Sequence, residues 1–288
     1  MKSLGLGPSP SPVRDVSRLA WRRAAAARLL APGTSRPVPE ETPIAFSYEG
    51  AAYAVMMATP ADLGDFAVGF SLSERIIASP ADLESLETVS TEDGILLRIT
   101  LANQPASAYW ERRRYLAGPS GCGLCGLESL AEAARLPPSV TVGVCITHKD
   151  ILDAMAALPA WQPMNRLTGA LHGAALWLPE KGIVAAREDV GRHNALDKLI
   201  GAASRDGIDA AGGAVLLTSR VSVEMIQKAA VLGAPILVAV SAPTALAVRV
   251  AEAAGITLVA VARQDGFEIF SHPDRVLGAE LGQPAAAD

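Results

Sequence analysis

Two of the three cysteines in this 288-residue sequence stand close together, in the segment Gly121-Cys122-Gly123-Leu124-Cys125-Gly126. Glycine has no Cβ and tolerates positive φ, so the three glycines predict an exposed, adaptable loop around both thiols. A helix is predicted to begin near Leu127, and its positive end would favour the thiolate form of Cys125. The segment therefore has the composition of a reactive thiol pair.

The spacing Cys-X-X-Cys serves four purposes in proteins: half of a zinc site, a dithiol redox pair, a sulfur carrier, or simple packing. A structural zinc site needs four ligands, and the remaining candidates form no second pair, although Cys145 and His148 have a loose C-X-X-H spacing. A thioredoxin-type pair would follow an early strand of a βαβ unit, whereas this pair stands in mid-chain. The glycines argue against burial. All four interpretations stay open at this point.

A second group of chemically capable residues occupies positions 188–198, with the sequence EDVGRHNALDK. The pattern predicts the end of a strand, a turn containing glycine, and the start of a helix. Arg192, His193 and Asn194 would stand at the open amide end of that helix, which is a favourable place for an anion. Lys198 would share a helix face with Asn194. The alternative is a capped helix with solvated charges.

A third group follows the apolar strands predicted in the C-terminal half, at 214–217, 236–240 and 257–262. These short apolar runs alternate with helical segments, which predicts parallel strands covered on both faces. Ligands of open α/β sheets bind outside the carboxyl ends of the strands. The hydroxyl and charged groups there suit the phosphate, ribose and purine edge of a nucleotide, although Ser and Thr also simply cap helices. The residues concerned are Ser219, Arg220, Ser222, Ser241 and the turn Arg263-Gln264-Asp265-Gly266.

His172 lies in the segment TGALHGA, where small neighbouring residues allow another group to approach closely. A zinc deaminase would need a glutamate two residues after this histidine and a later PCXXC segment. Position 174 is alanine, and the CXXC segment comes earlier in the chain. Deaminase chemistry is therefore not expected. No Walker A motif is present, and the one GXGXXG spacing, from Gly121 to Gly126, does not follow an early strand of a βαβ unit, which disfavours an ordinary Rossmann or kinase fold.

Composition limits the class of protein further. Acidic residues outnumber basic ones by 30 to 25, giving a net charge of −5, which argues against a general nucleic-acid binder. Three cysteines make no disulfide framework, so a reducing cytoplasm fits best. The most apolar run, residues 229–240, is short and contains Gly233 and Pro235, so no membrane span is expected.

The pattern predicts an α/β protein with a smaller N-terminal α+β part. We expect a mobile leader over residues 1–39, with a short helix at 19–30. Residues 40–140 form the α+β part ending in the cysteine loop, 141–277 the α/β part with a ligand pocket, and 278–288 a tail. Within the α+β part, hairpins are predicted to turn at Glu49-Gly50 and Asp93-Gly94, on either side of a helix from Asp62 to about Ala78.

Five motifs in this order, SGCGLCG, TGALH, EDVGRHNALDK, TSRVSVEM and SAPTALA, resemble the FdhD family of formate dehydrogenase accessory sulfurtransferases over about residues 40–277. The resemblance implies a cytidine-deaminase-like core with a mixed or parallel sheet, a homodimer, and a cytoplasmic maturation factor. It also implies that sulfur passes from a cysteine desulfurase to the molybdenum or tungsten bis-(molybdopterin guanine dinucleotide) cofactor of the formate dehydrogenase catalytic subunit.

Carried over residue by residue, Cys122 matches the persulfide-bearing cysteine of the family and Cys125 its partner. The segment Val261-Ala262-Arg263-Gln264-Asp265-Gly266 matches a loop linked to cofactor binding, for which GDP is the expected mimic. We expect the strand-end turns to hold the guanine dinucleotide tails, and His172 is a further expected cofactor-binding residue. Their phosphates are expected at four residues, Arg192, His193, Lys198 and Arg220. The alternative is a non-catalytic cofactor chaperone that uses its thiols as a zinc or redox clamp.

Overall fold

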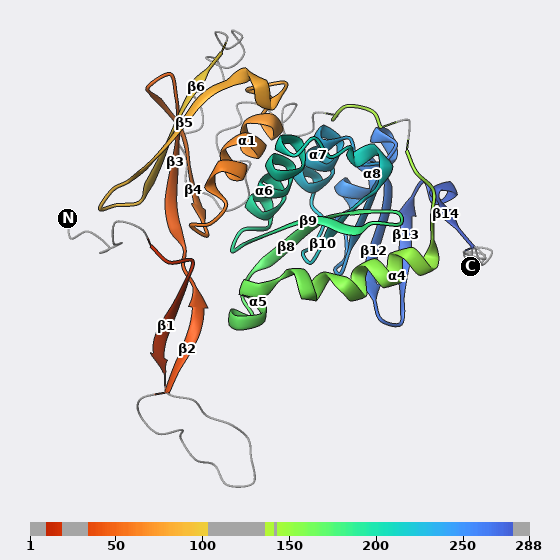
Figure 1. Ribbon diagram of the computed structural model, residues 1–288. Helices are drawn as coiled ribbons and strands as arrows, with labels where there is room; N and C mark the ends of the chain where they lie inside the picture. The colour runs from red at the N-terminus through yellow and green to blue at the C-terminus, as the bar shows by residue number, and fades with distance from the viewer. Residues whose placement is uncertain (1–9, 19–33, 103–135, 141–142, 279–288) are drawn as a thin grey trace. The chain divides into compact units, whose positions relative to one another are not determined.

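The computed structural model describes residues 10–18, 34–102, 136–140 and 143–278 (Figure 1). The cysteine loop and the helix expected at 19–30 lie outside the described residues. The described chain is a mixed α/β protein that forms two compact units. The first takes residues from 1–135, 159–174 and 185–208, and the second takes them from 136–158, 175–184 and 209–288.

The first unit begins with an antiparallel pair of strands, β1 (Val13–Arg18) and β2 (Thr34–Pro39). The prediction of a mobile leader did not include this pair and is corrected for these residues. Pro37 and Pro39 are compatible with β2 because a strand with one partner needs only some of its N–H groups for pairing.

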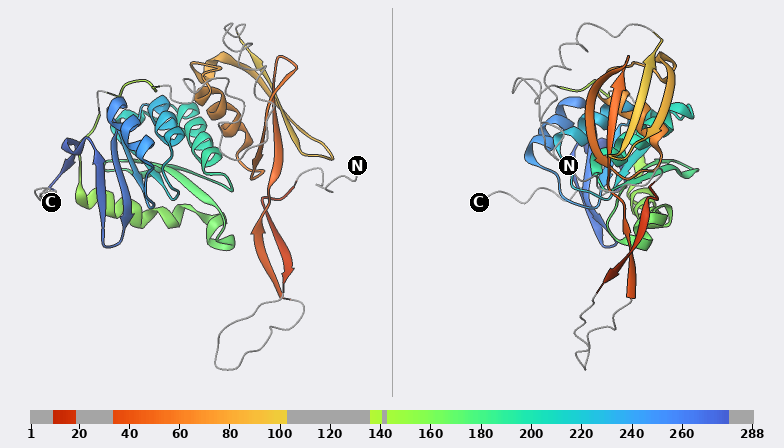
Figure 2. Two further views of the ribbon diagram at one scale, coloured as in Figure 1. Left: turned by 180° about the vertical axis from the view of Figure 1, so that it is seen from behind. Right: turned by 90° about the vertical axis from the view of Figure 1, so that its left-hand side faces the viewer.

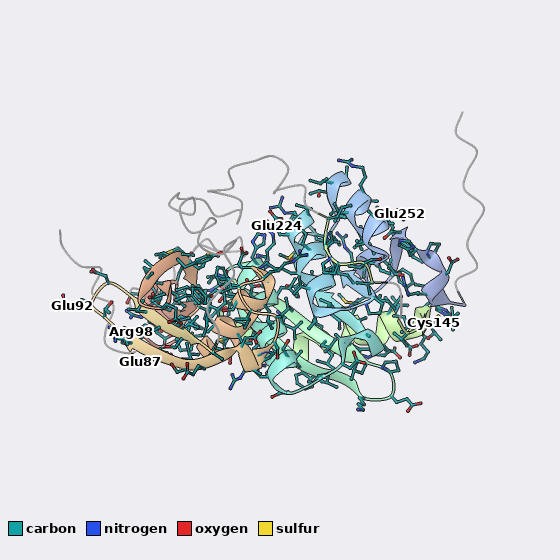
Figure 3. All side chains as sticks on the ribbon, turned by 90° about the horizontal axis from the view of Figure 1, so that it is seen from above. Glu87, Glu92, Arg98, Cys145, Glu224 and Glu252 are labelled. Carbon is teal, nitrogen blue, oxygen red and sulfur yellow. The ribbon has the colours of Figure 1, made fainter. Side chains whose placement is uncertain are left out.

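A four-stranded sheet follows in the order β4-β3-β6-β5. Its strands are β3 (Thr42–Tyr48), β4 (Ala51–Ala58), β5 (Leu83–Ser90) and β6 (Ile95–Leu101). Both predicted hairpin turns are confirmed, and Glu49 and Gly50 have the positive φ values, 51° and 75°, of a type I′ turn. β3 and β6 are parallel neighbours in the middle. Glu87 and Arg98 pair across the exposed face of β5 and β6 at 3.2 Å (Figure 3).

Helix α1 (Leu63–Ser73) packs an aromatic cluster against this sheet. The ring of Phe46 lies 5.0 Å from that of Phe66 and 4.3 Å from that of Phe70, measured between centroids. The helix ends at Ser73, earlier than predicted. Asp62 is its N-cap residue but makes no side-chain capping bond.

Helix α6 (Arg192–Arg205) packs closely on α1. A Cβ on Gly69 would lie 1.7 Å from the backbone oxygen of Asp197, and one on Gly201 would lie 1.9 Å from that of Asp65. Asp65 also accepts hydrogen bonds from Arg187 and Arg205, at 2.7 Å each. This grouping differs from the predicted division at residue 140, because α6 packs with the N-terminal helix.

Three short helices accompany these elements: η1 (Pro80–Asp82), η2 (Leu158–Trp161) and α5 (Pro163–Thr168). Helix α5 has six residues. It ends at Gly169, whose φ of 69° is a left-handed cap that glycine adopts readily.

A six-stranded sheet has the order β13-β12-β11-β10-β8-β9. Its strands are β8 (His172–Leu178), β9 (Gly182–Asp189), β10 (Ala214–Leu217), β11 (Ile236–Ala239), β12 (Thr257–Arg263) and β13 (Gly266–Ser271). The predicted parallel pairing of β10, β11 and β12 is confirmed, and β13 forms one edge of the sheet. β10 and β11 are completely buried, which explains their continuous apolar sequences.

In the second unit, helices α7 (Val223–Leu232) and α8 (Ala245–Ala254) pack together on one side of the parallel strands. Helix α4 (His148–Ala157) contacts β12 from the other side (Figures 1 and 2). The remaining elements are η3 (Ala210–Gly212), η4 (Pro273–Arg275) and the short parallel pair β7 (Ile146–Thr147) and β14 (Val276–Leu277). None of the helices in the described ranges is long and apolar enough to cross a membrane.

Candidate functional site

The candidate residues fall into three groups. Cys122 and Cys125 lie outside the described residues. His172, Arg192, His193 and Lys198 belong to the first unit, and the strand-end turns belong to the second. The two described groups are considered separately.

In the second unit, backbone hydrogen bonds join the three turns that follow β10, β11 and β12. Val221 N donates to Ala242 O at 3.3 Å, and Thr244 N donates back to Val221 O at 2.9 Å. Val261 N donates to Ser241 O at 3.4 Å. The structure therefore brings together the hydroxyl-rich and charged turns that the sequence predicted at one sheet edge.

The side chains of the first two turns differ in exposure. Ser219 is buried, and its Oγ donates to Arg220 O at 3.0 Å, whereas the Arg220 side chain is exposed. Ser222 is the N-cap of α7 but makes no capping bond, and its buried Oγ has no hydrogen-bond partner among the described residues. Ser241 is half-buried. Arg220 therefore presents a cation to solvent at this edge.

The third turn, Val261 to Gly266, contains an unusual backbone conformation. Val261 has a φ of 53°, within a β-bulge of the β12–β13 pairing. This left-handed region is strained for a β-branched residue, and such strain is concentrated at functional sites. Ala262 is buried, while Arg263, Gln264 and Asp265 are exposed at the tip.

In the first unit, Arg192 and His193 occupy the first turn of α6, as predicted. Arg192 is half-buried, and its Nε is buried without a hydrogen-bond acceptor among the described residues. Gly191 is the N-cap residue, and a Cβ there would lie 2.7 Å from Asn194 Nδ2. The Arg192 guanidinium therefore retains donor capacity at the positive end of a 14-residue helix.

Lys198 does not present its charge to a ligand. Its side chain is fully buried, and its ammonium donates to Asp189 Oδ2 at 2.6 Å and to Thr59 O at 2.8 Å. A phosphate could reach this nitrogen only by displacing those contacts from a closed interior. The buried position of Lys198 therefore does not support a phosphate-binding role for this residue.

Asp189, the partner of Lys198, was not identified as functionally important from the sequence. It also accepts bonds from Thr59 N at 3.0 Å, Gly191 N at 2.8 Å and Asn194 Nδ2 at 3.0 Å. One feature of the sequence could have identified it. Asp189 stands at the end of a predicted strand, and a carboxylate in a buried position needs several hydrogen-bond donors.

His172 is half-buried at the start of β8. A Cβ on the glycine that follows it would lie 2.4 Å from Nε2 of the buried Gln162, so a larger residue at position 173 would require the Gln162 side chain to shift. Glu188 accepts bonds from Met164 N at 3.0 Å and Asn165 N at 2.7 Å. Burial raises the pKa of the Glu188 carboxyl above the ordinary value, although these two bonds oppose the shift.

No group of three or more His, Cys, Asp or Glu side chains in the described part of the chain is arranged to hold a metal ion. Cys145 is an exposed free thiol just before β7 (Figure 3).

Comparison with known proteins places this architecture in a family. The model of the FdhD/NarQ family matches residues 39–277. A "Sulfur carrier protein FdhD" from Agrobacterium fabrum is 52% identical over 266 residues, covering 92% of this chain and 96% of that protein. A protein of the same name from Brucella abortus is also 52% identical, covering 92% of this chain and 97% of its own.

A solved structure supports the fold. The crystal structure of a candidate formate dehydrogenase accessory protein from Desulfotalea psychrophila matches with a TM-score of 0.71 at 23% identity. The match covers 93% of this chain and 100% of that one. The chain therefore belongs to the FdhD/NarQ family, as its motifs predicted.

Proposed function

We propose that this protein is a sulfurtransferase that acts through a cysteine persulfide. In this proposal it takes sulfur from a cysteine desulfurase and delivers it to the bis-(molybdopterin guanine dinucleotide) cofactor that formate dehydrogenase requires. The observation that carries the proposal is the CGLC segment in a chain about half identical to proteins named sulfur carriers.

The first chemical step is assigned to Cys122. Its thiolate attacks the outer sulfur of the donor persulfide, a new S–S bond forms, and the donor cysteine leaves as a thiolate. A free thiol with a pKa of about 8.5 is only a few per cent ionised at neutral pH, so this step needs help. Arg112, Arg113 and Arg114, which are close in sequence, can raise the thiolate fraction. The Cys125 thiolate then attacks the Cys122 persulfide. Attack on the outer sulfur moves that sulfur to Cys125 and frees the Cys122 thiolate, whereas attack on the inner sulfur forms the Cys122–Cys125 disulfide and releases hydrosulfide.

The cofactor, as bound substrate, is assigned to the strand-end turns of the second unit. The Arg220 guanidinium and the hydroxyls of Ser219, Ser222 and Ser241 suit phosphate and ribose groups. The exposed tip of the Val261–Gly266 loop provides polar groups for a purine edge. In the first unit, the start of α6 with Arg192 and His193 is a second place for a phosphate. GDP is the natural probe, and ADP is its control.

The proposal extends to a cytoplasmic homodimer with a cytidine-deaminase-like core, as the family resemblance implies. The described surface includes exposed apolar side chains such as Val55 and Met57 on β4. Nothing further about the dimer is needed for the chemistry.

The rival function is a cofactor chaperone whose thiols form a zinc or redox clamp. Incubation with a cysteine desulfurase and cysteine, followed by mass spectrometry, separates the two. One added sulfur atom on the CGLC segment supports transfer, whereas bound zinc without an adduct supports the clamp.

Calorimetry tests the nucleotide site. GDP should bind more tightly than ADP, and Arg220→Ala should weaken GDP binding. Equal affinity for the two nucleotides, or an Arg220→Ala variant that binds GDP as the parent protein does, would remove the strand-end turns from the proposal.

A further inference from the structure

The buried network around Asp189 connects three parts of the first unit. Its carboxylate accepts bonds from Thr59 N beyond β4, from Gly191 N before α6, and from Lys198 Nζ in the second turn of α6. Lys198 Nζ also donates to Thr59 O. Thr59 is therefore hydrogen-bonded both to Asp189 and to helix α6.

A second set of bonds fixes the same turn from its other side. Val190 N donates to Thr59 Oγ1 at 3.1 Å, and Asn194 Nδ2 donates to Met57 O at 2.9 Å. Val190 and Asn194, two positions before and two positions after Arg192, are therefore held in place by hydrogen bonds. A ligand contact made by Arg192 would lose less conformational entropy on binding as a result.

Apolar side chains could fill the space that the Asp189–Lys198 ion pair occupies. A buried ion pair often contributes no more stability than apolar side chains of the same size, so stability alone does not account for a charged pair at this position. This pair occurs where the helix begins, beside an arginine whose buried Nε has no acceptor among the described residues. Positioning of Arg192 would explain why an ion pair is found where the helix begins.

We propose that the Asp189–Lys198 pair is a positioning device that presents Arg192 to a phosphate group of the cofactor. Asp189 and Lys198 act through the backbone of the turn, and Arg192 makes the contact. This inference rests on the proposed function, because it assumes a phosphate-bearing ligand.

The test uses Lys198→Met, which preserves side-chain length and removes the charge. Asp65→Asn is the matched control, because it weakens the other ion-pair cluster of the same unit, with Arg187 and Arg205. Affinities for GDP and guanosine are measured by calorimetry below the unfolding temperature of every variant. We expect Lys198→Met to weaken GDP binding about tenfold, as for a misplaced charge-assisted hydrogen bond, while guanosine binding is unchanged. Asp65→Asn should leave both affinities at the parent values.

Unchanged GDP affinity in Lys198→Met, or an equal loss for GDP and guanosine, overturns the inference. If Lys198→Met does not fold, Asn194→Ser replaces it, because this change removes a donor to Asp189 without leaving a buried charge unpaired. Its expected effect is the same selective loss for GDP.

Amide hydrogen exchange separates failure of this inference from failure of the proposed function. Lys198→Met should accelerate exchange selectively at residues 190–194, whereas Asp65→Asn should not. If the parent protein binds no GDP but this local acceleration occurs, the nucleotide proposal fails, while the finding that the pair holds the turn remains. If exchange at 190–194 does not change, the pair does not position the turn.

Discussion

Lys198 Nζ lies 2.6 Å from Asp189 Oδ2, and both side chains are completely buried. The sequence placed Lys198 on an accessible helix face, where it could have met a phosphate. The structure shows that its charge is compensated inside the protein.

Removal of both partners should cost less than the sum of the two single removals. Asp189→Asn leaves a buried ammonium without its counter-charge, and we expect the free energy of unfolding to fall by about 3–5 kcal/mol. The double variant Asp189→Asn/Lys198→Met should lose less than the sum of the two single changes. Urea denaturation of all four proteins gives the coupling energy. Additive losses would show that the two side chains do not interact strongly.

The contact between α1 and α6 depends on glycine at position 69. Gly69→Ala should destabilise the protein by about 1–3 kcal/mol or more, because its Cβ would overlap the backbone oxygen of Asp197. Gly64→Ala in the same helix is the control, since its Cβ would meet only the flexible end of Arg205. Thermal unfolding should separate the two variants clearly, and similar unfolding temperatures would argue against this tight helix crossing.

Glu188 should make stability depend on pH in a direction opposite to that of most carboxylates. Burial raises its folded-state pKa, so the unfolded chain releases its proton first as pH rises above about 4.3. The contribution of Glu188 is therefore fully present below that pH and is lost as pH rises through the folded-state pKa.

Glu188→Gln removes this titration but also disturbs the bonds to Met164 N and Asn165 N, at a cost independent of pH. As pH rises from acidic to neutral, the unfolding free energy of Glu188→Gln should therefore increase relative to that of the parent protein. Denaturation curves across this range measure the shift. A difference that is constant with pH, or that shifts toward the parent protein, would contradict the raised pKa.

At position 261, glycine should give a more stable protein than alanine, which is the reverse of the usual order of stability in a strand. Glycine is normally less stable than alanine by about 0.5–1 kcal/mol, but at a φ of 53° it avoids the strain that any Cβ brings. Val261→Gly should therefore be more stable than Val261→Ala by about 1 kcal/mol. If the alanine variant is at least as stable, the left-handed conformation at this position is incorrect.

The parts of the fold that the sequence predicted are those with strong local signals. The hairpin turn at Glu49-Gly50 requires positive φ, and the continuous apolar runs of β10 and β11 require burial on both faces. The strand-end turns followed from the parallel pairing of these strands. In each case the local sequence and the observed structure require the same conformation.

The features that the sequence did not predict depend on contacts between distant segments. The packing of α6 on α1 depends on Gly69 and Gly201, which are far apart in the chain. The burial of Lys198 depends on Thr59, which approaches Asp189 only in the folded protein. Helical spacing indicates which residues share a face, but it does not show whether that face meets solvent or another element.

The most direct test of sulfur transfer is mass spectrometry of the chain after reaction with a cysteine desulfurase and cysteine. The parent protein and a Cys145→Ala control should each gain one sulfur atom on the peptide that contains Cys122 and Cys125. The adduct should be lost in Cys122→Ala, and treatment with a thiol reductant should remove it from the parent protein. Absence of the adduct from the parent protein, or its retention when both Cys122 and Cys125 are replaced by alanine, would contradict sulfur transfer through this pair.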